Sequence, residues 1–307
     1  MSLEHLAFID LPVHIGRGGF DHAAVDRRSG LLYVAHTAND AVDVIDTRLG
    51  KHVRSIQNLE GVAGALVHEE SGLVFTSNRG ENSVGLFTPG SPEVVKIAVG
   101  VRPNGLAYDP GRGILLCANV GDPNVPGSPS VTMVGVAERA VLATVGMPGR
   151  TRWAVFDPER QVFFVNIADP FEIVVVDPQR PDRIASTFEI PARGPHGLEL
   201  DEARGRLYCA CDAGTLVALD SRSGRTIDTL GLSGGPDVIF LDPERGHLHL
   251  AIGEPGVIDV IDVAAWKRVE VVATERGAHT IALDATAHHV YAFLPDTHRA
   301  MVFHDVA

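Results

Sequence analysis

The feature that most constrains this chain is a unit that recurs seven times along its length. The clearest copy runs from Gly194 to Asp220 and reads as a strand ending in an acidic residue, a polar turn, a second strand, another turn and a third strand. Its apolar residues alternate with period two, which predicts strands and not helices. The ends of the first strands align at Asp26, His68 (the one non-acidic position), Asp109, Asp157, Asp201, Asp242 and Asp284.

The spacing of these positions predicts the fold class. Successive gaps are 42, 41, 48, 44, 41 and 42 residues, and a repeat of this length built from short strands is typical of a β-propeller. A Pro-, Gly- and Ser-rich run over residues 121–130 predicts a long loop, which explains the longest gap. We therefore predict an all-β protein in which residues 1–307 form a single seven-bladed β-propeller of four-stranded blades.

The two ends of the chain show complementary deficits. The last copy stops after its third strand, whereas residues 4–12 resemble the fourth strands of other copies but follow no blade of their own. These deficits predict that residues 4–12 form the outer strand of the last blade. Such a closure would fasten the ring and leave no free sheet edge.

Charge and composition exclude several classes of partner. The net charge of −13 argues against nucleic acid or an anionic membrane surface as the main partner. No run approaches the roughly 18 apolar residues of a membrane helix, and the start lacks a secretory signal, so we expect a cytoplasmic protein, with export of a longer precursor left open. Three cysteines, Cys117, Cys209 and Cys211, form no disulfide framework; we expect small buried residues, with a soft-metal site as the alternative.

The candidate site comes from positions that break the repeat. The first strand of each blade should line the central channel, and five residues before each aligned position the chain carries Asp21, Ala63, Asn104, Arg152, His196, Asp237 and His279. We call these seven equivalent positions a column. If the column had only a structural role, we would expect small residues such as Ala63 throughout. Instead, four consecutive blades bring two imidazoles and two carboxylates to one rim of the channel.

These side chains suit a divalent metal ion, with Zn, Mn, Fe, Ni and Ca as candidates. We predict His196, Asp237 and His279 as the metal ligands and Asp21 as a further ligand or catalytic base. Two other interpretations stay open: acid–base chemistry without metal, and a hydrogen-bonded polar plug around channel waters.

The rest of the rim is expected to contact a small-molecule substrate. Arg152 is the only cation in the column, and it could orient a carboxylate, a lactone carbonyl or an enolate. It could equally pair with Asp21 or Asp237. Trp153 is expected to be channel wall more than a stacking platform. Further candidates for substrate contacts are Asn104, Trp153, His22 and His36.

Two stretches carry a resemblance to a known family. The segments LYVAHTANDAVDVIDTRLGKHVRSI and RPNGLAYDPGRGILLCAN resemble the YVTN-type repeat of YncE-like seven-bladed propellers. The wider superfamily is similar to lactonases, a streptogramin lyase, muconate-cyclising enzymes and non-catalytic binding proteins. Taken with the metal ligands predicted at the rim, the resemblance leads us to expect a metal-assisted hydrolase or lyase acting on a lactone-like or carboxylated substrate. The alternative is a non-catalytic propeller scaffold that binds a ligand or a protein.

Overall fold

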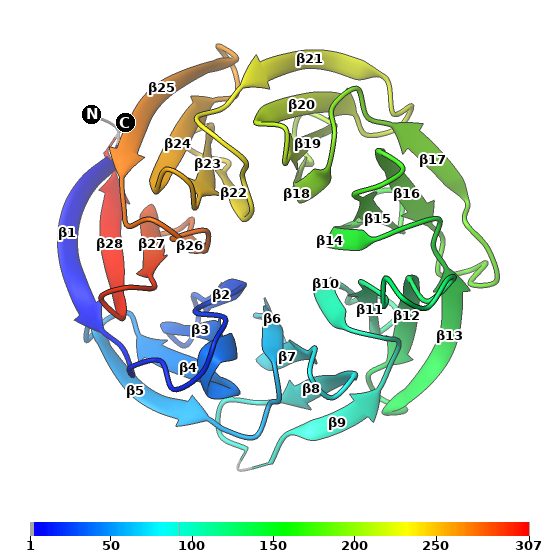
Figure 1. The fold of residues 1–307 in the computed structure, drawn as a ribbon, viewed down its shortest axis with the longest axis horizontal. Helices are drawn as coiled ribbons and strands as arrows, with labels where there is room; N and C mark the ends of the chain where they lie inside the picture. Colours follow the sequence, from blue (N-terminus) through cyan, green and yellow to red (C-terminus); the bar gives the residue numbers. More distant parts are fainter. Residues whose placement is uncertain (1–2, 92, 307) are drawn as a thin grey trace.

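Seven sheets radiate around a central channel in the computed structural model, which describes residues 3–91 and 93–306 (Figure 1). Each sheet contains four antiparallel strands. The predicted all-β, seven-bladed propeller is therefore confirmed. Within the described residues the one helical element is a short 3-10 turn, Thr37–Asn39, and no helix has the length and apolar character needed to cross a membrane.

The strands occupy four concentric positions. The innermost strands are β2 (Ala23–Asp26), β6 (Val62–His68), β10 (Pro103–Asp109), β14 (Thr151–Asp157), β18 (Pro195–Asp201), β22 (Ile239–Asp242) and β26 (Ile281–Asp284). The second strands are β3 (Leu31–His36), β7 (Leu73–Asn78), β11 (Ile114–Asn119), β15 (Val162–Ile167), β19 (Arg206–Cys211), β23 (His247–Ile252) and β27 (His289–Leu294). The third strands are β4 (Ala41–Asp46), β8 (Ser83–Phe87), β12 (Ser130–Gly135), β16 (Glu172–Val176), β20 (Thr215–Asp220), β24 (Val257–Asp262) and β28 (Arg299–Asp305). The outer strands are β5 (Lys51–Ile56), β9 (Val95–Ala98), β13 (Ala140–Gly146), β17 (Ser186–Glu189), β21 (Thr226–Gly231), β25 (Lys267–Ala273) and β1 (Leu3–Asp10).

Every aligned position of the repeat ends an innermost strand, and the acidic side chain caps the turn that follows. Asp284, for example, accepts hydrogen bonds from the backbone N–H groups of Thr286 and Ala287, both at 3.0 Å. A short carboxylate is suited to this role because it can satisfy backbone donors two and three residues ahead. His68 serves the same turn differently, through a 2.8 Å hydrogen bond between Nδ1 and the Ser71 hydroxyl.

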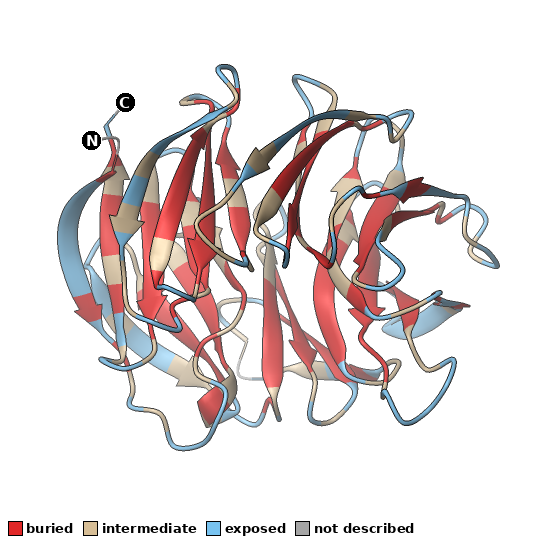
Figure 2. Cartoon of the chain, turned by 45° about the horizontal axis from the view of Figure 1, so that its top comes forward, coloured by how far each residue is buried: buried red, intermediate tan, exposed pale blue. Residues whose placement is uncertain are grey.

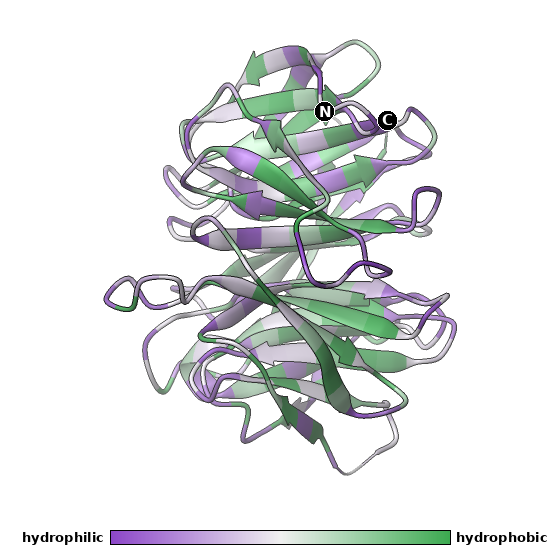
Figure 3. Cartoon of the chain, turned by 90° about the vertical axis from the view of Figure 1, so that its right-hand side faces the viewer, coloured by the Kyte–Doolittle hydropathy of each residue, from purple (hydrophilic) through white to green (hydrophobic). Residues whose placement is uncertain are grey.

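The core lies between neighbouring blades. Second and third strands are buried almost throughout, whereas outer strands such as β13 are largely exposed (Figure 2). Hydrophobic clusters join one blade to the next: Met133 of blade three and Phe163 of blade four belong to the same cluster. Hydrophobic residues accordingly follow the strands, and many connecting loops are hydrophilic (Figure 3). Packing blade against blade makes the ring one structural unit.

The ring closes as predicted. Strand β1 pairs antiparallel with β28, from Leu3 opposite Asp305 to Asp10 opposite Arg299 (Figure 1). Leu3 and Ile9 are buried by this pairing. The N-terminal strand therefore covers the edge that the last blade would otherwise expose.

Two smaller expectations also agree with the structure. The insertion after β11 is a loop that ends where β12 begins at Ser130. Cys117, Cys209 and Cys211 are buried and free of disulfides.

A bulge near the start of several innermost strands sets which residues face the channel. In β18, residues Pro195 and Gly197 pair with Cys211 and Ala210, so β18 contains one extra residue there. Equivalent irregularities occur in β6, β10 and β14. In a regular strand, residues three apart point to opposite faces. The extra residue reverses this parity, so that His196 and Glu199 both reach channel cavities.

Candidate functional site

The predicted column converges on one polar cavity at the mouth of the channel, with a volume of about 230 Å³. Six of its seven members line this cavity; Ala63 does not. Those six are Asp21, Asn104, Arg152, His196, Asp237 and His279. The cavity, hereafter the mouth cavity, therefore gathers the residues that depart from the small side chain expected of a structural column.

Four arginines line the same cavity, of which the sequence analysis identified one. Arg79 follows β7, Arg102 precedes β10, and Arg150 and Arg152 flank the start of β14. Arg79 donates to Asn104 Oδ1 at 2.6 Å and lies 3.4 Å from Asp21 Oδ2. Within the described parts of the chain, the guanidinium groups of Arg102 and Arg150 make no hydrogen bond or ion pair. The mouth cavity thus concentrates positive charge that its own acids only partly neutralise.

Arg102 and Arg150 occupy a position where the other blades carry glycine. Seven residues before the aligned positions, the remaining five blades have Gly19, Gly61, Gly194, Gly235 and Gly277. Arg102 has a φ of 55°, the left-handed conformation that glycine adopts without penalty. A side chain held in this conformation at a cavity wall is typical of a functional position. This glycine column is the sequence signal that could have identified both arginines.

The electrostatics of Arg150 reflect this crowding. Burial lowers the pKa of its guanidinium, and repulsion from Arg152, Arg102 and Arg79 lowers it further. A cavity of about 250 Å³ adjoins the mouth, lined by Arg102, Arg150 and the loop from Gly121 to Pro129. Arg102 and Arg150 therefore face both spaces, and an anion placed between them would relieve their mutual repulsion.

His196 is the most connected side chain of the mouth cavity. Its Nδ1 donates to Asp212 Oδ1 at 2.7 Å, and its Nε2 lies 3.0 Å from the Arg152 guanidinium. Arg152 also lies 3.4 Å from Asp212, and this pairing takes the place of the predicted pairing with Asp21 or Asp237. Burial lowers the pKa of His196, but the Asp237 carboxylate and the hydrogen bond to Asp212 outweigh it and raise the pKa to about 9.

Asp237 and His279 complete the predicted ligand set. Asp237 Oδ1 lies 3.0 Å from His196 Nε2, yet it is a buried oxygen with no aligned hydrogen bond among the described residues. Burial acts to raise the pKa of Asp237, and the positive charge of His196 overcomes it and lowers that pKa. His279 donates from Nδ1 to the Gly277 carbonyl at 2.8 Å, which leaves Nε2 free for a ligand.

These three side chains have the chemistry of metal ligands, but their candidate ligand atoms do not all lie close enough together to hold one ion. Both histidines engage Nδ1 with an oxygen acceptor, the supporting contact that commonly orients metal-binding imidazoles, and Asp237 supplies an unsatisfied oxygen. Among the residues described, however, only His247, His249 and Asp305 form a group whose ligand atoms all lie within 4.8 Å of one another. His196, Asp237 and His279 would have to draw closer together around an ion, and their role as ligands stays a prediction.

Asp21 and His22 lie on the innermost wall of the mouth cavity. His22 Nε2 is 3.3 Å from Asp21 Oδ1, and Asp21 also faces Arg79. Burial lowers the pKa of His22 despite the attraction of Asp21, so its imidazole is neutral at pH 7. Asp21 is thus held between an imidazole and a guanidinium, within reach of the cavity.

Two predicted substrate contacts lie elsewhere. Trp153 lines a second cavity further along the channel and is absent from the mouth cavity. His36 is fully buried at the end of β3, bonded to His14 and Asp43, each at 2.7 Å, and it lines neither cavity. Neither residue lines the mouth cavity, and their roles as substrate contacts stay predictions. Trp153 lies within the bulge of β14, which changes the side of the strand that its side chain faces. His36 is held in the core by its bonds to His14 and Asp43.

The group of His247, His249 and Asp305 could hold a metal ion, and it was not predicted from the sequence. All three side chains are buried, and Asp305 Oδ2 lies 2.7 Å from His247 Nδ1 and 3.2 Å from His249 Nε2. The histidines lie on β23 of blade six and the aspartate on β28 of blade seven. Only blade-to-blade packing brings them together, so no short sequence motif could have revealed the group.

Comparison with known proteins supports the fold and leaves the family open. No family model matches the sequence, and no curated relative matches it. A solved structure of Kuenenia stuttgartiensis hydrazine synthase is similar, with a TM-score of 0.82 and 12% sequence identity, covering 96% of this chain and 98% of that chain. At that identity the likeness shows a shared β-propeller fold alone. Membership of the YncE-like family stays a prediction.

Proposed function

We propose that the mouth cavity binds a small carboxylated molecule. The observation that carries this proposal is the set of four arginines around one cavity of about 230 Å³, two of them without a charged partner in the described structure. Guanidinium groups pair with carboxylates in a planar, two-pronged geometry, which makes them suited to such ligands. Asn104, held by Arg79, adds a polar contact at the same wall.

We further propose that the protein is a metal-assisted hydrolase or lyase acting on a lactone-like or carboxylated substrate. His196, Asp237 and His279 would hold the divalent ion, Asp21 would serve as a further ligand or base, and Arg152 would orient the substrate. A bound divalent ion would polarise a carbonyl or make a hydroxide available near neutral pH. Arg152 supports this role because it already reaches His196 Nε2, the nitrogen that an ion would take over, and would then be released toward the substrate.

The binding step is tested by calorimetry with tricarballylate, its neutral triamide and sulfate. We expect binding of the carboxylate and none of the triamide, with Arg150→Met weakening the affinity at least about tenfold, because this variant removes a full charge at a partly buried site. Arg276→Met is the matched control, since Arg276 pairs with Glu254 on the exposed surface. Equal binding of carboxylate and triamide, or an unchanged affinity in Arg150→Met, would refute an anion site.

The catalytic step is tested separately. Metal content is measured in protein purified without added metal or histidine tag, and lactone opening is followed by proton release with and without added zinc or manganese. Because a metal must displace the proton of His196, uptake should strengthen as the pH rises toward about 9. Carboxylate binding without metal uptake or turnover would favour the non-catalytic binding propeller.

A further inference from the structure

A second cavity, of about 400 Å³, lies at the other end of the channel from the mouth cavity. Its lining includes six of the seven residues that lie two positions before the ends of the innermost strands, among them Leu66, Val155 and Phe240. The equivalent position in the seven blades reads Ala24, Leu66, Ala107, Val155, Glu199, Phe240 and Ala282. Glu199 is the one polar member of this otherwise apolar column. We call this space the inner chamber.

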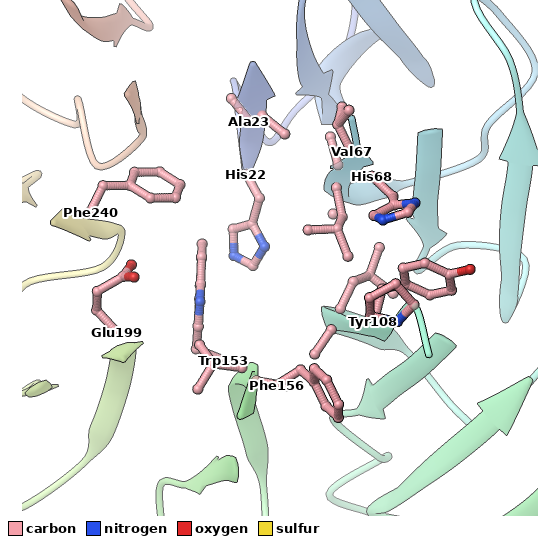
Figure 4. A pocket seen from close by; sticks show the side chains of 18 of the residues that line it. His22, Ala23, Val67, His68, Tyr108, Trp153, Phe156, Glu199 and Phe240 are labelled. Carbon is pink, nitrogen blue, oxygen red and sulfur yellow. The ribbon is translucent and has the colours of Figure 1, made fainter. Parts of the chain in front are cut away.

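The inner chamber and the mouth cavity share one lining side chain, His22, which packs against Trp153 with ring centroids 4.2 Å apart. Figure 4 shows these two rings side by side, with Phe240 and Glu199 on one side and His68, Tyr108 and Phe156 on the other. Trp153 also meets Phe240 edge-on at 6.2 Å. The inner chamber is therefore a distinct space with its own aromatic walls.

The charge of the inner chamber is opposite to that of the mouth cavity. Its described lining contains two acids, Glu199 and Glu202, and no Lys or Arg. Glu202 lies exposed at the rim, whereas Glu199 is half-buried among apolar side chains. Within the described chain Glu199 has no ion-pair partner. Burial raises the pKa of this carboxyl group to about 8, the response expected of an acid whose negative charge lacks a counterion.

We propose that the inner chamber binds an organic cation carried on an apolar or aromatic body, with Glu199 as the counterion. The carboxylate would supply the charge that fixes the cationic group, and the faces of Trp153 and Phe240 would contact it through cation–π attraction. The remaining apolar wall would cover the body of the ligand. A neutral ligand would use the apolar wall but would leave Glu199 without a role.

Benzyltrimethylammonium is the probe for this proposal, because its charge is permanent and its size suits the chamber. Its neutral isostere neopentylbenzene and the anion phenylacetate are the comparison ligands. Binding is followed by calorimetry and by tryptophan fluorescence in a Trp266→Phe background, where Trp153 is the remaining tryptophan. We expect the cation to bind and to change Trp153 emission, with the isostere weaker by at least about tenfold.

Variants of the chamber test which side chains bind the cation. Glu199→Gln should weaken cation binding at least about tenfold while leaving neopentylbenzene unchanged, and Phe240→Leu should weaken cation binding several-fold. Glu93→Gln, a change at an exposed acid that lines neither cavity, is the matched control. Affinity should rise between about pH 6 and pH 9 in the wild type as Glu199 ionises, and stay flat in Glu199→Gln. Failure of the cation to bind, equal binding of cation and isostere, or full cation binding by a folded Glu199→Gln variant would overturn the proposal.

Discussion

The two ends of the channel are built from the same seven strands and yet have opposite chemistry. The mouth cavity carries four arginines around a His–Asp cluster, whereas the inner chamber is aromatic and apolar with acids and no cation in its described lining. One side chain, His22, faces both. The repeat thus supplies a neutral scaffold. The residues that differ between blades at a few equivalent positions determine which ligand each end of the channel can accept.

Removing the closing strand should have the largest effect, because both ends depend on an intact ring. Deleting residues 1–12 exposes the edge of β28 and removes the buried Leu3 and Ile9. We expect thermal unfolding to occur at least about 10 °C lower, or folding to fail. Calorimetry should show that both ligand affinities are lost together. An unchanged melting temperature would mean that closure contributes little to either end.

Arg152→Met should affect the mouth cavity and spare the inner chamber. The variant keeps the apolar stem and removes the charge that contacts His196 and Asp212. We expect carboxylate binding to weaken several-fold and the melting temperature to fall by only about a few degrees. Because Arg152 acts to lower the pKa of His196, an NMR titration should show that pKa rising in the variant.

That NMR titration also tests whether the two ends are independent. Binding of benzyltrimethylammonium should be unchanged in Arg152→Met. A stability collapse with unaltered carboxylate binding would instead make the column a polar plug.

The two ends should also contribute to stability in different pH windows. Both Glu199 and His196 have a raised pKa in the folded state, to about 8 and about 9, so each holds its proton more tightly when folded. The stability from each is fully present below its unfolded pKa and is lost as the pH rises through its folded pKa. The stability contributed by Glu199 is therefore lost between pH 4.5 and about pH 8. The stability contributed by His196 is lost between pH 6.5 and about pH 9.

Chemical denaturation across this pH range separates the two contributions. Glu199→Gln should flatten the acidic part of the stability profile, and His196→Gln the alkaline part. If one substitution flattened both parts, the two ends would be electrostatically coupled and would not act as separate sites.

The smallest effect is expected at the two cysteines of β19 in blade five. Cys209 and Cys211 are fully buried, with sulfur atoms 3.9 Å apart, and burial raises the pKa of Cys209 well above its ordinary value. Thiol reagents should label neither cysteine until the protein unfolds. Rapid labelling of the native protein, followed by mass spectrometry, would indicate that blade five opens and that the scaffold joining the two ends is not rigid.

The repeat and the residues that depart from it could be recognised in the sequence because they depend on patterns within a few neighbouring residues. Strand alternation, the capping acid at each strand end and the unmatched terminal strand predicted seven blades and their closure. The column from Asp21 to His279 could be predicted because equivalent repeat positions become neighbours around a ring. The same reasoning would have found Arg102 and Arg150, which replace glycine in blades three and four.

Three features required the tertiary structure. The bulges near the starts of β14 and β18 change which residues share a side of each strand, so sequence spacing alone assigned Trp153 to the mouth and did not single out Glu199. His247, His249 and Asp305 meet only because two blades pack together. Charge pairing was decided between neighbouring blades, where Arg152 reaches Asp212 and not Asp21.

The sequence by itself thus determined the architecture and the residues that depart from it, because strand period and turn chemistry act over a few neighbouring residues. The tertiary structure decided which of those residues face one another and which end of the channel they serve. The physical reason is that burial and charge pairing depend on distances between separate blades, which the order of residues along the chain does not specify.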